Sequence, residues 1–202
     1  MSRRAGAARG LALALLLPLG CETTERVVPG PRARGPEPQR QSREARLKEQ
    51  TEERPDDPRV WLDLGEYYEA SREYSPAVAA YERFDALLEE ETKRTGVRYT
   101  AGGYHLGRAY ARARHFQGAV HHLNRVLALK PEGEEAALNP HFREAHYLLG
   151  GVFYESRQWK PAREHFLAFR ALGGEPERVE PWLERIDEAL AEPAPPTRPA
   201  GG

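Results

Sequence analysis

The side chains best suited to chemistry are seven histidines and one cysteine, and their spacing limits what they can do. His121 and His122 are adjacent, so a helix would point them in different directions. His141 and His146 are five residues apart and do not stack on one helix face. There is no HExxH motif, and one cysteine cannot form a CxxC site or an intrachain disulfide. We therefore expect no metal site and no cofactor.

Other catalytic patterns are also missing from the sequence. Carboxylate pairs such as Glu66 and Glu69 are ordinary on a helix surface, and no glycine-rich phosphate loop or Ser/His/Asp constellation stands out. The 202 residues carry a formal net charge of -1, without the basic footprint that nucleic acid requires. We therefore predict a protein that is not an enzyme, that binds no nucleic acid and that needs no small-molecule substrate.

The lone cysteine, Cys21, directly follows a segment with the features of an export signal. Residues 1–20 begin with positive charges, continue with a short apolar run and end in a small residue: Arg3, Arg4, Arg9, Leu11 to Leu17 and Gly20. The run is too short for a bilayer, which needs about 20 apolar residues. We predict a signal peptide over residues 1–20.

The stretch Leu17-Pro18-Leu19-Gly20-Cys21 resembles the bacterial lipobox. The resemblance implies that the Cys21 thiol carries a diacylglyceryl group, that the chain is cut just before it, and that the new N-terminus is acylated, for example with palmitate. Pro18 departs from the family, which usually has leucine three residues before the cysteine. The alternative is an ordinary cleaved signal with an incidental cysteine, but such a cut wants a small residue at the position of Pro18.

The resemblance also implies a location. In well-studied bacteria an aspartate after the lipidated cysteine retains the protein in the inner membrane, and here that residue is Glu22. We therefore expect a lipid anchor in the outer membrane, with the protein facing the periplasm.

Two segments lack apolar periodicity. Residues 21–56 hold the lipidated cysteine, several prolines and many charges, so we predict a flexible tether. The stretch from Ser42 to Arg54 lacks proline and glycine and could form a transient helix. Residues 192–202 are rich in Pro, Gly and Ala and are predicted to be a disordered tail.

Between these segments an internal repeat occurs three times in one phase. Each copy has Leu-Gly, then an aromatic residue three positions after the Gly, then an aromatic residue and Ala after a short turn. The copies hold Leu64, Gly65, Tyr68, Tyr74 and Ala77; Leu106, Gly107, Tyr110, Phe116 and Ala119; and Leu149, Gly150, Phe153, Trp159 and Ala162. The glycines let a neighbouring helix approach, and Pro76 and Pro161 suit the start of a second helix. Neither helix of a pair can bury its apolar face alone, so the pairs must stack.

This pattern resembles the tetratricopeptide repeat (TPR) family, whose unit is a pair of helices. The resemblance implies an all-α solenoid of about three repeats over residues 57–176, at 57–91, 100–133 and 143–176. The match includes Trp61, Tyr81, Pro131 and Phe166. The repeat glycines are 42 and 43 residues apart instead of 34, so the junctions near Thr92–Tyr99 and Gly133–Pro140 must be longer or the helices must extend. Residues 177–191, with Val179, Trp182, Ile186 and Leu190 at helical spacing, are predicted to be a capping helix.

The resemblance further implies that proteins bind in a concave groove lined by the first helix of each repeat. Carrying these positions over gives Leu62, Glu66, Glu69, Tyr104, Arg108, Arg112, Tyr147 and Tyr154. Arg108 and Arg112 are four residues apart on one face and could hold a carboxylate or an acidic helix. The alternative is that these charges are solvated and that the tyrosines only complete the packing between repeats.

The resulting hypothesis is a scaffold or assembly factor for an envelope complex, such as a secretin, pilus or motility machine or an outer-membrane barrel. The alternative is an adaptor that brings cell-wall hydrolases or synthases together. A third class of function is an enzyme or a small-ligand carrier, but no motif in the sequence indicates one.

Overall fold

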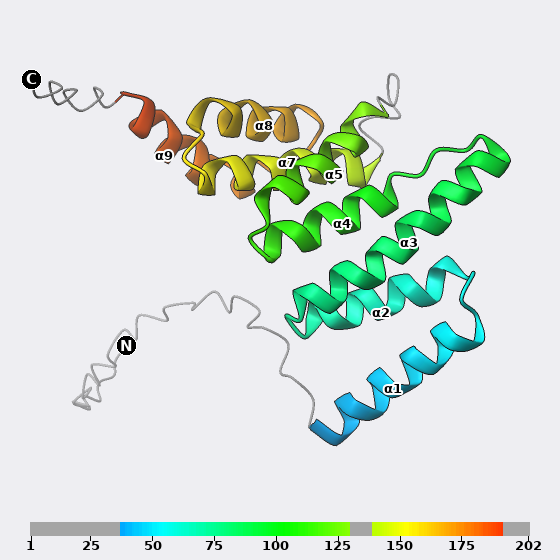
Figure 1. Ribbon diagram of the computed structural model, residues 1–202. Helices are drawn as coiled ribbons and strands as arrows, with labels where there is room; N and C mark the ends of the chain where they lie inside the picture. Colours follow the sequence, from blue (N-terminus) through cyan, green and yellow to red (C-terminus); the bar gives the residue numbers. More distant parts are fainter. Residues whose placement is uncertain (1–36, 130–138, 192–202) are drawn as a thin grey trace, which may run out of the picture. The chain divides into compact units, whose positions relative to one another are not determined.

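The computed structural model describes residues 37–129 and 139–191, and within these ranges every regular element is a helix. Figure 1 shows three helical hairpins stacked in chain order. They are α2 (Pro58–Ala70) with α3 (Tyr74–Thr95), α4 (Ala101–Arg112) with α5 (Phe116–Ala128), and α7 (Pro140–Glu155) with α8 (Trp159–Ala171). Helix α1 (Glu37–Glu53) comes first, and a 3-10 turn (Pro176–Arg178) and α9 (Glu180–Ala191) come last. The predicted all-α solenoid of helical hairpins is confirmed.

Each hairpin is held together where a glycine of its first helix meets a large side chain of its second. Gly65 lies against the ring of Tyr81, Gly107 against Leu123, and Gly150 against the ring of Phe166. A Cβ built on Gly150 would lie 2.6 Å from that ring, closer than carbon atoms approach in real structures. The alanines at the equivalent place in the second helices, Ala77, Ala119 and Ala162, are fully buried.

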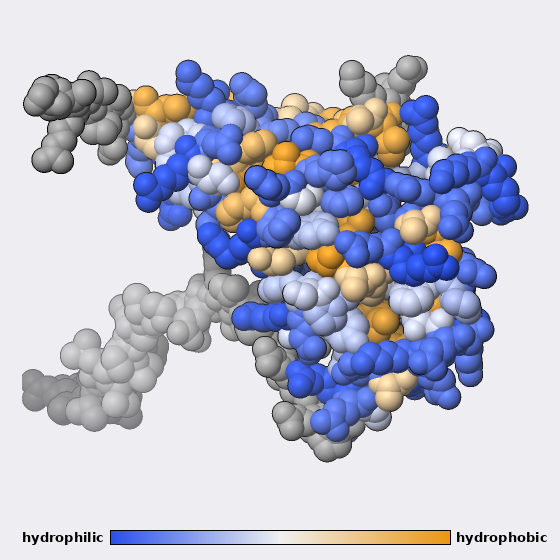
Figure 2. Space-filling view, viewed as in Figure 1, coloured by the Kyte–Doolittle hydropathy of each residue, from blue (hydrophilic) through white to orange (hydrophobic). Residues whose placement is uncertain are grey.

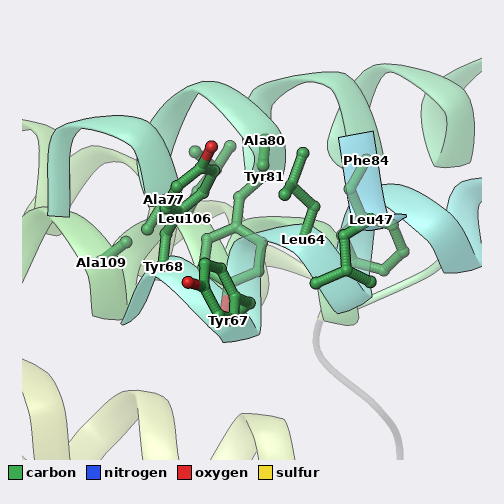
Figure 3. Close-up of a cluster of buried hydrophobic side chains, with 10 residues drawn as sticks. All are labelled: Leu47, Leu64, Tyr67, Tyr68, Ala77, Ala80, Tyr81, Phe84, Leu106 and Ala109. Carbon is green, nitrogen blue, oxygen red and sulfur yellow. The ribbon is translucent and has the colours of Figure 1, made fainter. Parts of the chain in front are cut away.

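The apolar core runs through all three hairpins. Figure 3 shows its first part, in which α1 to α4 contribute Leu47, Leu64, Tyr67, Tyr68, Ala77, Ala80, Tyr81, Phe84, Leu106 and Ala109. A second cluster joins α5 to α7, and a third joins α8 to α9. Because each cluster includes residues of adjoining hairpins or of the closing helix, no hairpin has a core of its own.

Half of the first predicted junction is helix. Helix α3 has 22 residues and continues to Thr95, where Gly96 ends it in the left-handed conformation with φ of 76°. Part of the extra length therefore extends α3, and residues 96–100 connect it to α4. The described residues do not include most of the second predicted junction. The predicted signal peptide, the part of the predicted tether before α1 and the predicted tail also lie outside them.

The structure differs from the prediction of a flexible tether over residues 21–56. Residues 37–53, almost half of this segment, form α1, a helix of 17 residues that packs against α2. Leu47 is the anchor of this helix in the core, with only 7% of its surface exposed.

Two tyrosines of α2 make hydrogen bonds to α1. The Tyr67 hydroxyl donates to the carbonyl of Arg40 at 3.1 Å, and the Tyr68 hydroxyl donates to the carboxylate of Glu44 at 3.0 Å. The α1 sequence has almost no apolar face, so its own pattern gives no sign of these contacts. The tyrosines that hold it lie 24 and 27 residues further along the chain.

At the other end of the stack, α9 covers α8. Val179, Leu183 and Ile186 are buried against the rings of Phe166 and Phe169. Leu183 was not among the predicted apolar positions but is buried, whereas the predicted Leu190 is 39% exposed. The outward side of α9 is strongly charged, with Glu180, Glu184, Asp187 and Glu188 exposed. This helix thus gives the stack a polar end.

The surface of the described residues is mostly hydrophilic, as Figure 2 shows for one face. Among these residues, none of the helices has the length and apolar content needed to cross a membrane.

The close approach at the repeat glycines gives a test with a built-in control. Gly150 and Gly151 are neighbours on α7, but a Cβ at Gly151 would meet nothing within 4 Å. Gly150→Ala should lower the unfolding free energy by about 1–3 kcal/mol, because the methyl group collides with Phe166. Gly151→Ala should raise it by about 0.5–1 kcal/mol through helix propensity alone. Equal urea midpoints for the two variants would contradict this account of the hairpin.

Candidate functional site

The predicted binding residues come from the first helices of the three hairpins, α2, α4 and α7. We call their common side the first-helix face. It is made of Leu62, Glu66 and Glu69 from α2; Tyr104, Arg108 and Arg112 from α4; and Tyr147, Gly151 and Tyr154 from α7. Glu66, Arg108 and Gly151 directly follow the three repeat glycines and so occupy equivalent positions. Gly151 was not among the predicted residues.

Glu69 is the most buried residue of this face and the centre of a charge network. Only 5% of its surface is exposed. Its carboxylate accepts from Arg108 Nε at 2.9 Å and Nη2 at 2.6 Å, and Arg112 Nη1 lies 2.8 Å away. The Tyr81 hydroxyl donates to the same carboxylate at 2.9 Å. The network therefore joins α2 and α3 of one hairpin to α4 of the next.

The network explains the protonation of its members. Burial raises the pKa of Tyr81 well above its ordinary value, and the neighbouring Glu69 carboxylate raises it further. Burial opposes the charge on Arg108, but the carboxylate of Glu69 outweighs that effect and raises the pKa of the guanidinium. A neutral phenol and a charged guanidinium thus share one carboxylate.

The carboxylate that Arg108 and Arg112 were predicted to hold is therefore already supplied by the chain. Arg108 is engaged in this internal ion pair, and its side chain is only 20% exposed, so little of it is accessible to a partner. Arg112 is half exposed, so it can still meet a second anion. The pairing joins residues about 40 positions apart, and only the stacking of the hairpins brings them together.

A second set of polar and aromatic contacts joins α4 to α7. The Tyr104 ring stacks on His141 with the ring centres 4.7 Å apart, and Thr100 Oγ1 lies 3.0 Å from His141 Nδ1. His105 is buried beneath this stack, with its Nδ1 atom 3.0 Å from Arg108 Nη2. Because the guanidinium can only donate, Nδ1 must accept and the proton of neutral His105 is assigned to Nε2.

The two tyrosines of α7 face the closing helix and its lead-in turn. The guanidinium of Arg178 sits 4.2 Å from the centre of the Tyr147 ring. Tyr154 packs edge-on against Trp182, at 4.8 Å between ring centres, and against Trp159 at 5.3 Å. Both tyrosines are half-buried, so each has a packing role and an accessible side.

Between these tyrosines α7 has an open position. Tyr147, Gly151 and Tyr154 follow one another at i, i+4 and i+7 and so share one side of the helix. A Cβ at Gly151 would meet nothing within 4 Å, which shows open space there. On α2, Glu66 is exposed and Leu62 half-exposed. The accessible part of the face is thus acidic at α2, basic at Arg112 and aromatic at α7.

Two histidines of the third hairpin lie close together. His146 and His165 bring their Nδ1 atoms within 2.9 Å across α7 and α8, and burial lowers the pKa of His146 to about 4. In the ranges 37–129 and 139–191, no three His, Cys, Asp or Glu side chains come together as metal ligands. The histidine pair is a neutral packing contact of the third hairpin.

The buried carboxylate provides a second test. Glu69→Ala leaves Arg108 buried without a counter-charge, so the unfolding free energy should fall by about 3–5 kcal/mol. Adding Arg108→Met should restore much of the loss, because the buried charge is then gone. Glu66→Ala, one turn away and exposed, is the control and should change the free energy by less than about 0.5 kcal/mol. Urea unfolding measures all three, and a Glu69 variant as stable as the Glu66 variant would show that the network does not hold the hairpins together.

The buried histidine makes stability depend on pH. Burial, then Arg108 and His141, lower the pKa of His105 to about 3, below its ordinary value of 6.5. The unfolded chain therefore binds the extra proton first, and the stability that neutral His105 contributes is lost as the pH falls from about 6.5 towards about 3. The loss for this group should approach about 1.4 kcal/mol per pH unit. His105→Gln should flatten the pH dependence measured by thermal or urea unfolding, whereas His121→Gln, an exposed control, should not. The same slope in both variants would rule this out.

Comparison with known proteins supports the fold. No family model matches the chain, and no curated protein matches it. Among solved structures, it is similar to a protein of Podosopora anserina whose crystal structure is described as that of a kinesin light chain with nearly identical TPR-like repeats. The TM-score is 0.53 at 20% sequence identity, over 67% of this chain and 68% of the other. The repeated glycine contacts and this likeness together identify the architecture as a TPR-type helical repeat.

Proposed function

We propose that this chain is a TPR-type interaction module that binds a partner protein on its first-helix face. The observation that carries the proposal is the open position at Gly151, flanked by two half-buried tyrosines and continuous through α4 with the exposed Glu66 of α2. Tyrosine and arginine are enriched at protein–protein hot spots, because they combine a large contact area with a polar group. The face offers both types on rigid helices.

The partner surface should match the charges that remain free. Glu66 attracts a basic group, Arg112 an acidic group, and the space at Gly151 admits an apolar side chain between Tyr147 and Tyr154. An extended segment that follows α2, α4 and α7 in turn would meet these three environments in order. Because Arg108 is bound to Glu69, we do not assign it a direct contact with the partner.

We further propose that the module is a lipoprotein held at the outer membrane through Cys21 and that it helps to assemble an envelope complex in the periplasm. The support is the lipobox-like stretch before Cys21 and the residue Glu22 after it. Fifteen residues separate Cys21 from the start of α1, and fully extended they span at most about 50 Å. The start of α1 would thus lie within that distance of the membrane surface.

Photocrosslinking in cells tests the face. A photoreactive residue at position 66 and another at the half-exposed position 112 should capture the same protein, because both positions belong to one surface. Position 124, exposed on α5, is the control and should not capture it. In addition, Gly151→Arg should abolish capture from position 66 by filling the open space. Capture of one protein from all three positions, or capture that survives Gly151→Arg, would refute the face as the binding surface.

A further inference from the structure

The turns inside the three hairpins repeat one unusual feature. Arg72, Arg114 and Arg157 all adopt the left-handed backbone conformation, with φ of 61°, 60° and 57°. In each turn the residue after the arginine donates its N–H to the carbonyl five residues back, as Glu73 does to Tyr68 at 2.8 Å. Glycine takes this conformation freely, whereas other residues lose about 1–2 kcal/mol there. The backbone alone therefore does not account for an arginine in all three turns.

The three turns lie next to one another along one edge of the stack. A hollow of about 400 Å³ is lined by Arg72 to Pro76 from the first turn and Ala113 from the second. Arg114 of the second turn lies 3.2 Å from Glu155 at the third. In Figure 1 these turns are on the left, and the junctions from α1 to α2 and from α3 to α4 are on the right. We call residues 70–76, 112–118 and 155–161 the hairpin-turn edge.

The hairpin-turn edge carries an excess of positive charge. Apart from Arg112, which pairs with Glu69, it holds four cationic side chains and two carboxylates: Arg72, Arg114, Arg157 and Lys160 against Glu73 and Glu155. The Arg114–Glu155 pair is exposed on both sides, so it holds the guanidinium only weakly. Arg72 and Arg157 are exposed.

The opposite edge has the opposite balance at its ends. Where α1 joins α2, five carboxylates stand against two arginines: Glu49, Glu52, Glu53, Asp56 and Asp57 against Arg54 and Arg59. Where α8 joins α9, Glu175, Glu177 and Glu180 stand against Arg170 and Arg178. In the described part of the chain, positive charge is therefore in excess along the hairpin turns, and negative charge is in excess at the two ends of the opposite edge.

The chain also enters the stack at the positive edge. Helices α1 and α2 are antiparallel, and Tyr67 and Tyr68 near the end of α2 contact Arg40 and Glu44 near the start of α1. The start of α1 is thus beside the turn that holds Arg72. An anchor at Cys21 would therefore be attached to the stack at this edge, and not at the acidic one.

We propose that the hairpin-turn edge is a membrane-facing surface that binds anionic phospholipid headgroups. This inference rests on the proposed lipid anchor for its orientation, but the binding itself does not require the lipid. Each arginine or lysine near an anionic bilayer contributes about 1 kcal/mol, which falls off within a Debye length of about 10 Å. Each turn also places an aromatic residue two positions after its arginine: Tyr74, Phe116 and Trp159. Half-exposed aromatic rings are well suited to the headgroup region.

Vesicle flotation of the full chain with Cys21→Ser tests the surface without the anchor. The protein should float with vesicles that contain phosphatidylglycerol and not with pure phosphatidylcholine, and high salt should release it. R72Q/R114Q/R157Q should weaken binding at least about tenfold. The control R59Q/K93Q/R98Q removes three exposed cations from the opposite edge and should change binding less than about twofold. The charge-preserving R72K/R114K/R157K should bind like the parent.

Residues before α1 are the same in all these variants, so differences between variants report on the edge. Equal vesicle binding by the two glutamine triples, or no binding to the anionic vesicles by the parent, would overturn the proposal. Circular dichroism shows whether each triple is folded. If the hairpin-turn glutamine triple unfolds, loss of binding by the folded lysine triple would equally overturn the proposal. Fractionation of cells that carry the chain with Cys21 intact tests the anchor separately. If the chain is found outside the membrane fraction, the lipoprotein proposal is wrong, and the vesicle experiment still tests the hairpin-turn edge.

Discussion

The fold depends on the contact between a bare helix backbone and a large side chain, made once in every hairpin. Gly150 against Phe166 is the clearest case, because the next residue, Gly151, is free of such contact. A side chain at the first position would push the two helices apart by about the radius of a methyl group, and close packing propagates such a shift to the neighbouring layers. The large side chains that fill these contacts, Tyr81, Leu123 and Phe166, are also buried in the core, so hairpin geometry and hydrophobic burial are one requirement.

The ties between hairpins are of a different kind, and they determine which side chains remain free for a partner. The buried Glu69 carboxylate holds Arg108 and Tyr81, and the Tyr104–His141 stack continues the connection to α7. Such a pair contributes little net stability but strongly disfavours arrangements that leave one charge unpaired, so it favours one register of stacking. The same pairing withdraws an arginine from the face where family resemblance would have placed it as a ligand.

The ends, the first-helix face and the hairpin-turn edge of the stack differ in charge and accessibility. Helices α1 and α9 give charged ends, and the first-helix face presents open space at Gly151 and an exposed carboxylate at Glu66. The hairpin-turn edge carries an excess of positive charge and lies beside the start of α1. An interaction module with this distribution can lie with one edge on an anionic surface while its first-helix face remains accessible from the side.

The sequence by itself determined the hairpins, because the spacing of glycine, aromatic residue and alanine within a helix pair is local and repeats in phase. It did not show that α1 is a helix of the stack, since α1 has few apolar residues of its own and is held by Tyr67 and Tyr68 of another helix. It also identified Arg108 as a residue on the right face but not its partner. A charge pair between residues 39 positions apart forms only when stacking brings them together and removes both from water. Local spacing of residue types therefore specifies the repeat unit. Tertiary packing alone decides which polar groups pair with one another inside the stack and which remain accessible for binding.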